Sequence, residues 1–167
     1  ILPHYKLFRP FARIKITMSN VNIKQASFSD LNEIMEIEYT CFGEDAFSRQ
    51  QMAYLITQAK GIFLIAEYDS KIAGYISFTT SKRHHTGRIY TFADLPEYRT
   101  CGIRGIVLNK TIEYAETKKL NAIFLEVRTD NAAAISVYEK KGFVKRSIKP
   151  GYYHDGADAY SMVFYRK

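Results

Sequence analysis

The stretch LEVRTDNAAAISVYEKKGF, residues 125–143, changes its hydrophobic period at its middle. Residues 121–128 form a short apolar run that predicts a buried strand. Residues 131–142 show helical spacing and end at a glycine, which predicts a helix. A buried strand that carries a carboxylate, Glu126, and leads directly into a helix with an asparagine and a tyrosine raises the hypothesis of a functional site.

The composition is that of one ordinary globular domain. The chain has 167 residues, of which 47% are hydrophobic and 25% charged, and it is long enough to bury a sizeable core. The sequence contains no uninterrupted run of 18 apolar residues, so no membrane span is predicted. The spacing of Cys41 and Cys101 matches neither a metal site nor a disulfide framework, so we expect reduced thiols in a cytoplasmic protein.

The formal charge of +7 is unevenly distributed. Residues 1–17 carry four basic side chains and no acid, so the remainder of the chain is at +3. A domain near +3 does not require nucleic acid as a partner. We interpret residues 1–17 as an N-terminal extension before a start at Met18, and residues 18–167 as a single domain. A transit peptide or an extra strand is the alternative for residues 1–17.

Hydrophobic periodicity predicts an alternation of strands and helices along the chain. The predicted strands are residues 21–27, 62–68, 71–80, 88–95, 121–128, 143–148 and 159–167, and the predicted helices are residues 29–42, 47–61, 102–120 and 131–142. A hairpin-rich first half followed by strand–helix–strand units indicates a mixed α/β sheet with helices on both faces.

Local residues predict where several of these elements begin and end. Ser29 is a plausible cap for the first helix. Ser48 and Gln51 fit a capping box at the second, with Gly61 as its stop. Asp69–Ser70 predicts a tight hairpin turn.

A glycine-containing turn precedes the helix of residues 102–120. The first turn of a helix has unpaired backbone N–H groups and the positive end of the helix dipole, and glycine lets a phosphate approach them. Gly102 and Gly105 flank this start, and Arg99 and Arg104 add positive charge. The segment is a candidate pyrophosphate site, although a simple turn would have the same composition.

Three segments together carry a resemblance to a known family. They are PEYRTCGIRG, LEVRTDNAAAISVYEKKGF and GYYHDGADAYSMVF. The chain resembles the Gcn5-related N-acetyltransferase (GNAT) superfamily, most of all its bacterial ribosomal-protein-alanine N-acetyltransferase type. The resemblance implies a mixed, mostly antiparallel seven-stranded sheet with a splayed parallel strand pair and about four helices on both faces.

The resemblance also implies a cofactor site and a catalytic pair. Acetyl-CoA would lie between the strands of residues 88–95 and 122–128, and no metal is implied. The implied cofactor-binding residues are Phe92, Ala93 and Asp94 along the pantetheine arm, Arg99, Thr100, Cys101, Gly102, Ile103, Arg104 and Gly105 around the pyrophosphate, and Asn131. Glu126 matches the family's general base, and Tyr138 matches its general acid.

The chemistry of amine acetylation suits these two roles. A peptide α-amino group has a pKa of about 7.7–8.0 and must lose its proton to attack a thioester. Glu126 can accept that proton, and we expect burial to raise its pKa toward neutrality. Tyr138 can donate its phenolic proton to the departing sulfur. In the alternative interpretation Glu126 is a solvated charge or a partner of Arg128, and Tyr138 is core packing.

Two residues depart from the family pattern. Arg104 occupies the last small-residue position of the pyrophosphate loop, and Asp94 stands where an aliphatic residue is usual. We expect acetyl-CoA binding to survive, with the Asp94 side chain pointing away from the cofactor.

The acceptor is the least determined part of the prediction. The favoured acceptor is the N-terminal α-amino group of a protein or peptide, and the alternatives are a small amine or a non-catalytic CoA-binding or nucleic-acid-binding module. The acid pair Glu44 and Asp45 could attract a cationic acceptor.

The segment of residues 150–158 is predicted to link the last two strands. Tyr152 and Tyr153 could line the acceptor channel or simply pack, and His154 and Asp155 are expected to be solvated. No RNA-binding motif supports a nucleic-acid partner, and the protein is expected to be a monomer or homodimer.

Overall fold

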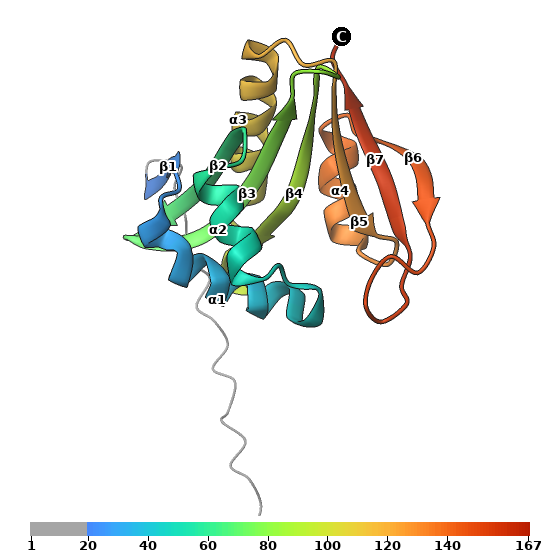
Figure 1. Cartoon of the computed structure of the whole chain (residues 1–167). Coiled ribbons are helices and arrows are strands. Elements are labelled where there is room, and N and C mark those ends of the chain that lie inside the picture. Colours follow the sequence, from blue (N-terminus) through green and yellow to red (C-terminus); the bar gives the residue numbers. More distant parts are fainter. Residues whose placement is uncertain (1–19) are drawn as a thin grey trace, which may run out of the picture.

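The computed structural model describes residues 20–167 (Figure 1). The predicted extension of residues 1–17 and the start at Met18 lie outside the described residues. No helix among residues 20–167 has both the length and the apolar character needed to cross a bilayer.

The strands and helices follow the predicted order. The strands are β1 Val21–Gln25, β2 Gly61–Tyr68, β3 Lys71–Ser81, β4 Thr86–Asp94, β5 Ala122–Arg128, β6 Val144–Lys149 and β7 Ala159–Tyr165. The α-helices are α1 Leu31–Phe42, α2 Arg49–Thr57, α3 Ile103–Thr117 and α4 Ala132–Lys140. Three short 3₁₀ turns are η2 Phe28–Asp30, η3 Gly43–Asp45 and η4 Pro96–Tyr98.

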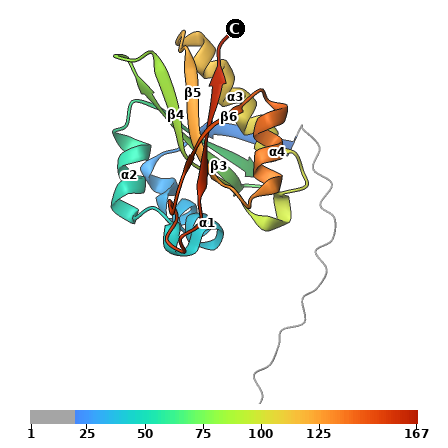
Figure 2. The same cartoon turned by 90° about the vertical axis from the view of Figure 1, so that its right-hand side faces the viewer.

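The strands of the described chain form one seven-stranded sheet in the order β1-β2-β3-β4-β5-β7-β6. Only β4 and β5 pair in parallel, and the other described neighbours are antiparallel. Helices α1 and α2 lie on one face of the sheet and α3 and α4 on the other (Figure 1, Figure 2). The predicted fold class is therefore confirmed.

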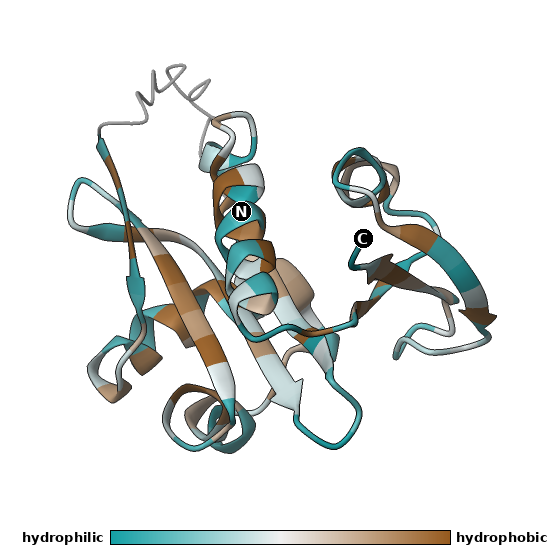
Figure 3. Cartoon of the chain, turned by 90° about the horizontal axis from the view of Figure 1, so that it is seen from above, coloured by the Kyte–Doolittle hydropathy of each residue, from teal (hydrophilic) through white to brown (hydrophobic). Residues whose placement is uncertain are grey.

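The sheet divides the apolar core into two layers. Leu31, Met52 and Phe63 belong to the layer between α1, α2 and the sheet. Val107 and Phe143 belong to the larger layer beneath α3 and α4. Apolar residues gather along the central strands of the sheet (Figure 3), as expected for strands that are covered on both faces.

The parallel strands β4 and β5 are paired only at one end. Thr86, Gly87 and Arg88 face Ala122, Ile123 and Phe124, and no pairing follows. The strands then diverge toward the end of the molecule that carries the α1–α2 loop (Figure 1). The edge of β4 over residues 89–94 that faces β5 is thus left without a strand partner among the described residues.

A β-bulge lies at the point where the two strands separate. Ser77 pairs with Thr91 and Phe78 with Ile89, so Tyr90 has no opposite residue on β3. A bulge of this kind bends the strand and increases its twist. Tyr90, the extra residue of the bulge, is exposed, and the pairing of β4 with β5 stops two residues earlier at Arg88.

Two predicted boundaries are wrong. Ser27, not Ser29, starts the first helical segment, because its N–H donates to Asp30 Oδ2 at 2.8 Å within a capping box on η2. Gly61 does not end α2; it begins β2 with φ +143°, and a Cβ there would lie 2.0 Å from the Phe78 carbonyl oxygen. Close strand packing, not helix termination, therefore requires this glycine.

Other local predictions are confirmed. Ser48 and Gln51 form the capping box of α2. Asp69 and Ser70 both have positive φ values, 53° and 64°, which are the values expected in a type I′ hairpin turn. Neither cysteine forms a disulfide within the described chain.

Candidate active site

A cavity of about 960 Å³ occupies the space between the separated strands. We call it the central cavity. It is lined by the predicted site residues Phe92, Ala93, Asp94, Arg99, Arg104, Glu126, Asn131 and Tyr138. The remaining predicted residues, Thr100, Cys101, Gly102, Ile103 and Gly105, form the turn and the first residues of α3 beside it. The sequence prediction therefore placed residues from four separate segments at one site.

Glu126 lies on β5 between two cations. Its carboxylate accepts hydrogen bonds from Arg88 at 2.7 Å and from Lys149 at 2.6 Å. Burial acts to raise the pKa of Glu126, but the hydrogen bonds from Arg88 and Lys149 outweigh it and the pKa is lowered. The expectation of a raised pKa is wrong, and so is the pairing of Glu126 with Arg128.

Tyr138 lies on α4, packed between Phe92 and Phe143 at ring-centroid distances of 6.2 and 5.7 Å. Its side chain is 6% exposed and lines the central cavity. No hydrogen bond from its hydroxyl to another described residue is present. Burial raises the pKa of Tyr138 to about 12, so the phenol keeps its proton at neutral pH and could supply it as an acid but could not act as a base.

The start of α3 presents free backbone donors. Gly102 is the N-cap, with φ +77°, and the first intrahelical bond runs from the Ile106 N–H to its carbonyl. The N–H groups of Ile103, Arg104 and Gly105 precede that bond. A Cβ on Gly102 or Gly105 would meet nothing within 4 Å. Open space and unpaired donors at a helix N-terminus suit an anionic group.

The two departures from the family pattern pair with each other. Arg104 donates a hydrogen bond to Asp94, which is 2% exposed, and Arg99 Nε lies 3.9 Å from the same carboxylate oxygen. The Arg104 guanidinium also lies over the Phe92 ring at 5.4 Å. Asp94 does not point away from the site as expected; it belongs to the cavity wall, and Arg104 neutralises its charge.

Asn131 is the N-cap of α4. Its side-chain oxygen accepts from the Ala134 N–H at 3.1 Å. The oxygen is thus engaged by the helix, and the amide NH₂ is the group with which Asn131 can donate to a ligand.

Arg128, at the end of β5, ties two loops together. It donates to Asp155 at 2.7 Å and lies 3.9 Å from Asp45 Oδ2. Asp45 also accepts from the His154 N–H at 2.8 Å. These contacts join the α1–α2 loop to the β6–β7 loop across one mouth of the central cavity.

This bridge bears on two expectations about the loops. Asp45 pairs with Arg128 and accepts from the His154 N–H, so it does not present a free charge to a cationic acceptor. His154 and Asp155 are exposed to solvent, as expected, and the hydrogen bond from Arg128 lowers the pKa of Asp155 to about 2. Tyr152 and Tyr153 both line the central cavity.

Glu38 is a cavity-lining carboxylate that the sequence analysis did not single out. It is 1% exposed and accepts hydrogen bonds from the Tyr75 hydroxyl, from Thr91 Oγ1 at 2.9 Å and from the Phe47 N–H at 2.8 Å. Its position on the apolar stripe of α1, after Leu31, indicated burial. Three donors satisfy the carboxylate, so it joins α1 to β3, β4 and the α1–α2 loop.

The separated parallel strands, Glu126 and Tyr138 meet at the central cavity, and the N-terminus of α3 lies beside it. Sequence comparison identifies the family. Residues 29–143 match the acetyltransferase (GNAT) family, and the chain belongs to that family. It is an N-acetyltransferase.

Known proteins similar to this chain include N-terminal acetyltransferases. An N-alpha-acetyltransferase of Sulfurisphaera tokodaii is 29% identical over 152 residues, covering 84% of this chain and 90% of that protein. The Escherichia coli ribosomal-protein-S18-alanine N-acetyltransferase has a TM-score of 0.78 at 25% identity, covering 87% of this chain and 93% of that one. Arabidopsis thaliana Naa50 with the bisubstrate analogue CoA-Ac-MVNAL has a TM-score of 0.78 at 21% identity, covering 88% and 99%.

Proposed function

We propose that this enzyme acetylates the N-terminal α-amino group of a protein or peptide, with acetyl-CoA as the acetyl donor. The observation that carries the proposal is the central cavity, which joins a helix N-terminus suited to a pyrophosphate with Glu126 and Tyr138. The S. tokodaii relative, named an N-alpha-acetyltransferase, supports an α-amino acceptor.

The donor end of the central cavity fits a nucleotide pyrophosphate. The N–H groups of Ile103, Arg104 and Gly105 and the positive end of α3 would hold its charge. Over residues 92–94, β4 has no described strand partner on its β5 side, so the backbone groups along that edge would be able to bond an extended arm in the manner of a strand. Acetyl-CoA supplies an acyl thioester at the end of that arm.

Glu126 and Tyr138 would handle the two protons of the reaction. The amine nitrogen becomes far more acidic once it has attacked a carbonyl, so a carboxylate with a lowered pKa can still accept its proton, directly or through a water. Arg88 and Lys149 hold that carboxylate in place. Tyr138 would donate its proton to the sulfur as the C–S bond breaks.

The loop bridge shapes the acceptor end. Arg128 and Asp45 hold the α1–α2 loop against the β6–β7 loop, and Tyr152 and Tyr153 add aromatic walls. A cavity end walled by two loops in this way suits the narrow end of a polypeptide chain. A small amine would also fit, so the acceptor must be tested directly.

A CoA-release assay against a panel of N-terminal peptides and small amines tests the proposal. We expect turnover with peptides that is lost when their α-amino group is blocked. Small amines used at higher kcat/KM than every peptide would favour a small-molecule acetyltransferase instead. No release with any acceptor would contradict the proposed function.

Glu126→Gln should lower kcat with a peptide acceptor by about 10²-fold, the lower end of the range for general acid–base groups. The low end is expected because Arg88 and Lys149 weaken Glu126 as a base. Glu139→Gln, the same change on an exposed residue of α4 that pairs with Lys145, is the control and should have no effect. Equal activity of the Glu126 and Glu139 variants would show that the carboxylate takes no part.

The pH dependence of kcat/KM should follow the ionisation of the acceptor amine. Because the pKa of Glu126 is lowered, its carboxylate is ionised throughout the neutral range and produces no acid limb there. We expect kcat/KM to rise as pH increases through the amine pKa, about 7.7–8.0 for a peptide. Because the Tyr138 pKa is about 12, deprotonation of this residue should not lower kcat/KM below pH 10.

The same profile should shift when the acceptor changes. With an acceptor whose amine has a lower pKa, the rise in kcat/KM should occur at a pH that is lower by the difference between the two amine pKa values. A rise in kcat/KM near pH 6 that is independent of the acceptor and disappears in Glu126→Gln would contradict the assignment of the pH dependence to the acceptor amine.

A further inference from the structure

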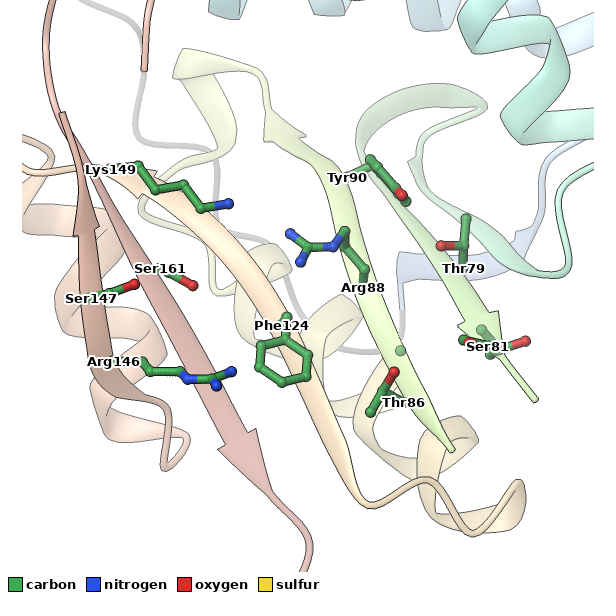
Figure 4. Close-up of a pocket in the computed structure, with 12 residues that line it drawn as sticks. Thr79, Ser81, Thr86, Arg88, Tyr90, Phe124, Arg146, Ser147, Lys149 and Ser161 are labelled. Carbon is green, nitrogen blue, oxygen red and sulfur yellow. The ribbon is translucent and has the colours of Figure 1, made fainter. Parts of the chain in front are cut away.

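A second hollow of about 770 Å³ adjoins the central cavity. It lies on the face of the sheet opposite α3 and α4, across β3, β4, β5, β7 and β6 (Figure 4). Its lining includes three cations, Arg88, Arg146 and Lys149, six serine and threonine residues, and no carboxylate. We call it the basic groove.

The basic groove is continuous with the acceptor end of the central cavity. Arg88, Tyr90 and Lys149 line both hollows. Arg88 and Lys149 extend toward each other from opposite sides of the gap (Figure 4), where both bond Glu126. Whatever occupies the basic groove therefore lies next to the amine that reacts.

Arg146 gives the basic groove a positive charge that no neighbour neutralises. Its guanidinium lies over the Phe124 ring at 5.5 Å, and Arg88 lies over the same ring at 5.9 Å. Arg146 is exposed and forms no ion pair with any residue of the described part of the chain. Contact with an aromatic ring holds a guanidinium in position while leaving its N–H donors free.

We propose that the basic groove binds acidic side chains in the segment of the acceptor that follows its N-terminus. This inference rests on the proposed function, because it requires a peptide acceptor. Phe124 lies two residues along β5 from Glu126, about 7 Å at the rise of a strand. An extended peptide advances about 3.3 Å per residue, so the third to fifth acceptor residues would reach Arg146.

An acidic peptide suits the basic groove better than a nucleic acid. The groove opens onto the site where the acceptor reacts, and its volume accommodates a few residues. Its Phe124 ring is contacted by two guanidiniums and does not offer a free stacking platform.

Peptides that differ only in charge test the proposal. Two acceptors share their first two residues and length and carry Glu or Lys at positions three to five. We expect the wild type to favour the acidic peptide by about tenfold in kcat/KM, through KM, as two or three partly exposed ion pairs would produce. The preference should fall in high salt, because exposed charges are screened.

Two variants on β6 provide the comparison. Arg146→Glu should abolish or invert the preference for the acidic peptide. Lys145→Glu changes the neighbouring residue, which contacts Glu139 and Tyr160 and does not line the basic groove, and should keep the preference. The two variants carry the same net charge, so a general charge effect would change both alike.

The outcomes separate this inference from the proposed function. Turnover of both peptides at equal kcat/KM would overturn the groove assignment and leave the acetyltransferase function intact. If neither peptide is acetylated, the anisotropy of a labelled acidic peptide measures groove binding directly, and equal binding by wild type and Arg146→Glu would overturn the assignment. Displacement of the acidic peptide by any single-stranded RNA, lost in Arg146→Glu, would identify the groove as a nucleic-acid site.

Discussion

Replacing Tyr138 with phenylalanine should lower kcat by about 10²–10⁴-fold, the range expected when a general acid is removed. The hydroxyl is the only group lost, since the ring contacts with Phe92 and Phe143 remain. Its hydroxyl makes no hydrogen bond within the described chain, so the substitution leaves no unsatisfied partner. Single-turnover acetyl transfer, together with acetyl-CoA affinity measured by calorimetry, should show a slow chemical step with unchanged donor binding.

Tyr160→Phe is the matched control for this substitution. Tyr160 lies on β7 beneath Lys145 and outside the central cavity, so its variant should react at the wild-type rate. A Tyr138→Phe enzyme that keeps more than a tenth of the wild-type kcat would mean that the sulfur departs without a proton from this residue.

Replacing Arg104 with alanine should lower the free energy of unfolding by about 3 kcal/mol. Removing one member of a buried ion pair leaves an uncompensated charge and typically costs about 3–5 kcal/mol. The lower figure is expected because the Arg104 side chain is 20% exposed and Arg99 lies 3.9 Å from Asp94. Urea unfolding should show a lower midpoint with an unchanged slope.

The double variant Asp94→Val with Arg104→Ala should recover most of that loss. Buried ion pairs are often replaced by apolar residues with little loss of stability. We expect the double variant to unfold within about 1 kcal/mol of the wild type. Lys110→Ala, an exposed residue of the same helix that pairs with Glu113, should cost less than about 0.5 kcal/mol. Additive effects of the two buried substitutions would refute the pairing.

The predictions for Tyr138 and Arg104 are linked, because Arg104 and Asp94 both affect the pKa of Tyr138. Burial raises the pKa of this tyrosine most, while Arg104 lowers it and Asp94 raises it. Arg104→Ala alone therefore leaves a nearby carboxylate that makes the phenol a weaker acid. We expect the single variant to slow acetyl transfer as well as to lose stability, and the double variant to recover both.

Much of the fold could be predicted because it depends on local patterns. Alternating and helical periodicities reflect which faces each segment buries, and they placed the elements and their order correctly. The boundaries were less certain, because contacts from other segments override local preferences. Gly61 resembled a helix stop, yet the carbonyl of Phe78 on the neighbouring strand is what requires it.

The residues that the resemblance implied for the candidate site gather at one cavity, but the electrostatics of that cavity were not predicted. Glu126 and Tyr138 lie only 12 positions apart on consecutive elements, and the motif that carries them is local. The sequence did not show that Arg88 and Lys149 would hold Glu126. These partners are 38 and 23 residues away, and only the assembled sheet brings them together. The pKa of Glu126 is lowered for that reason.

The sequence alone determined the order of elements through its hydrophobic period, and its resemblance to the GNAT family implied the family and the positions of Glu126 and Tyr138. The tertiary structure decided which charges neutralise each other: Asp94 with Arg104, Glu126 with two cations, and Asp45 with Arg128. It also left Arg146 without an acidic partner among the described residues, beside the site of reaction. Charge pairing depends on distances across the fold, and such distances are absent from a one-dimensional pattern.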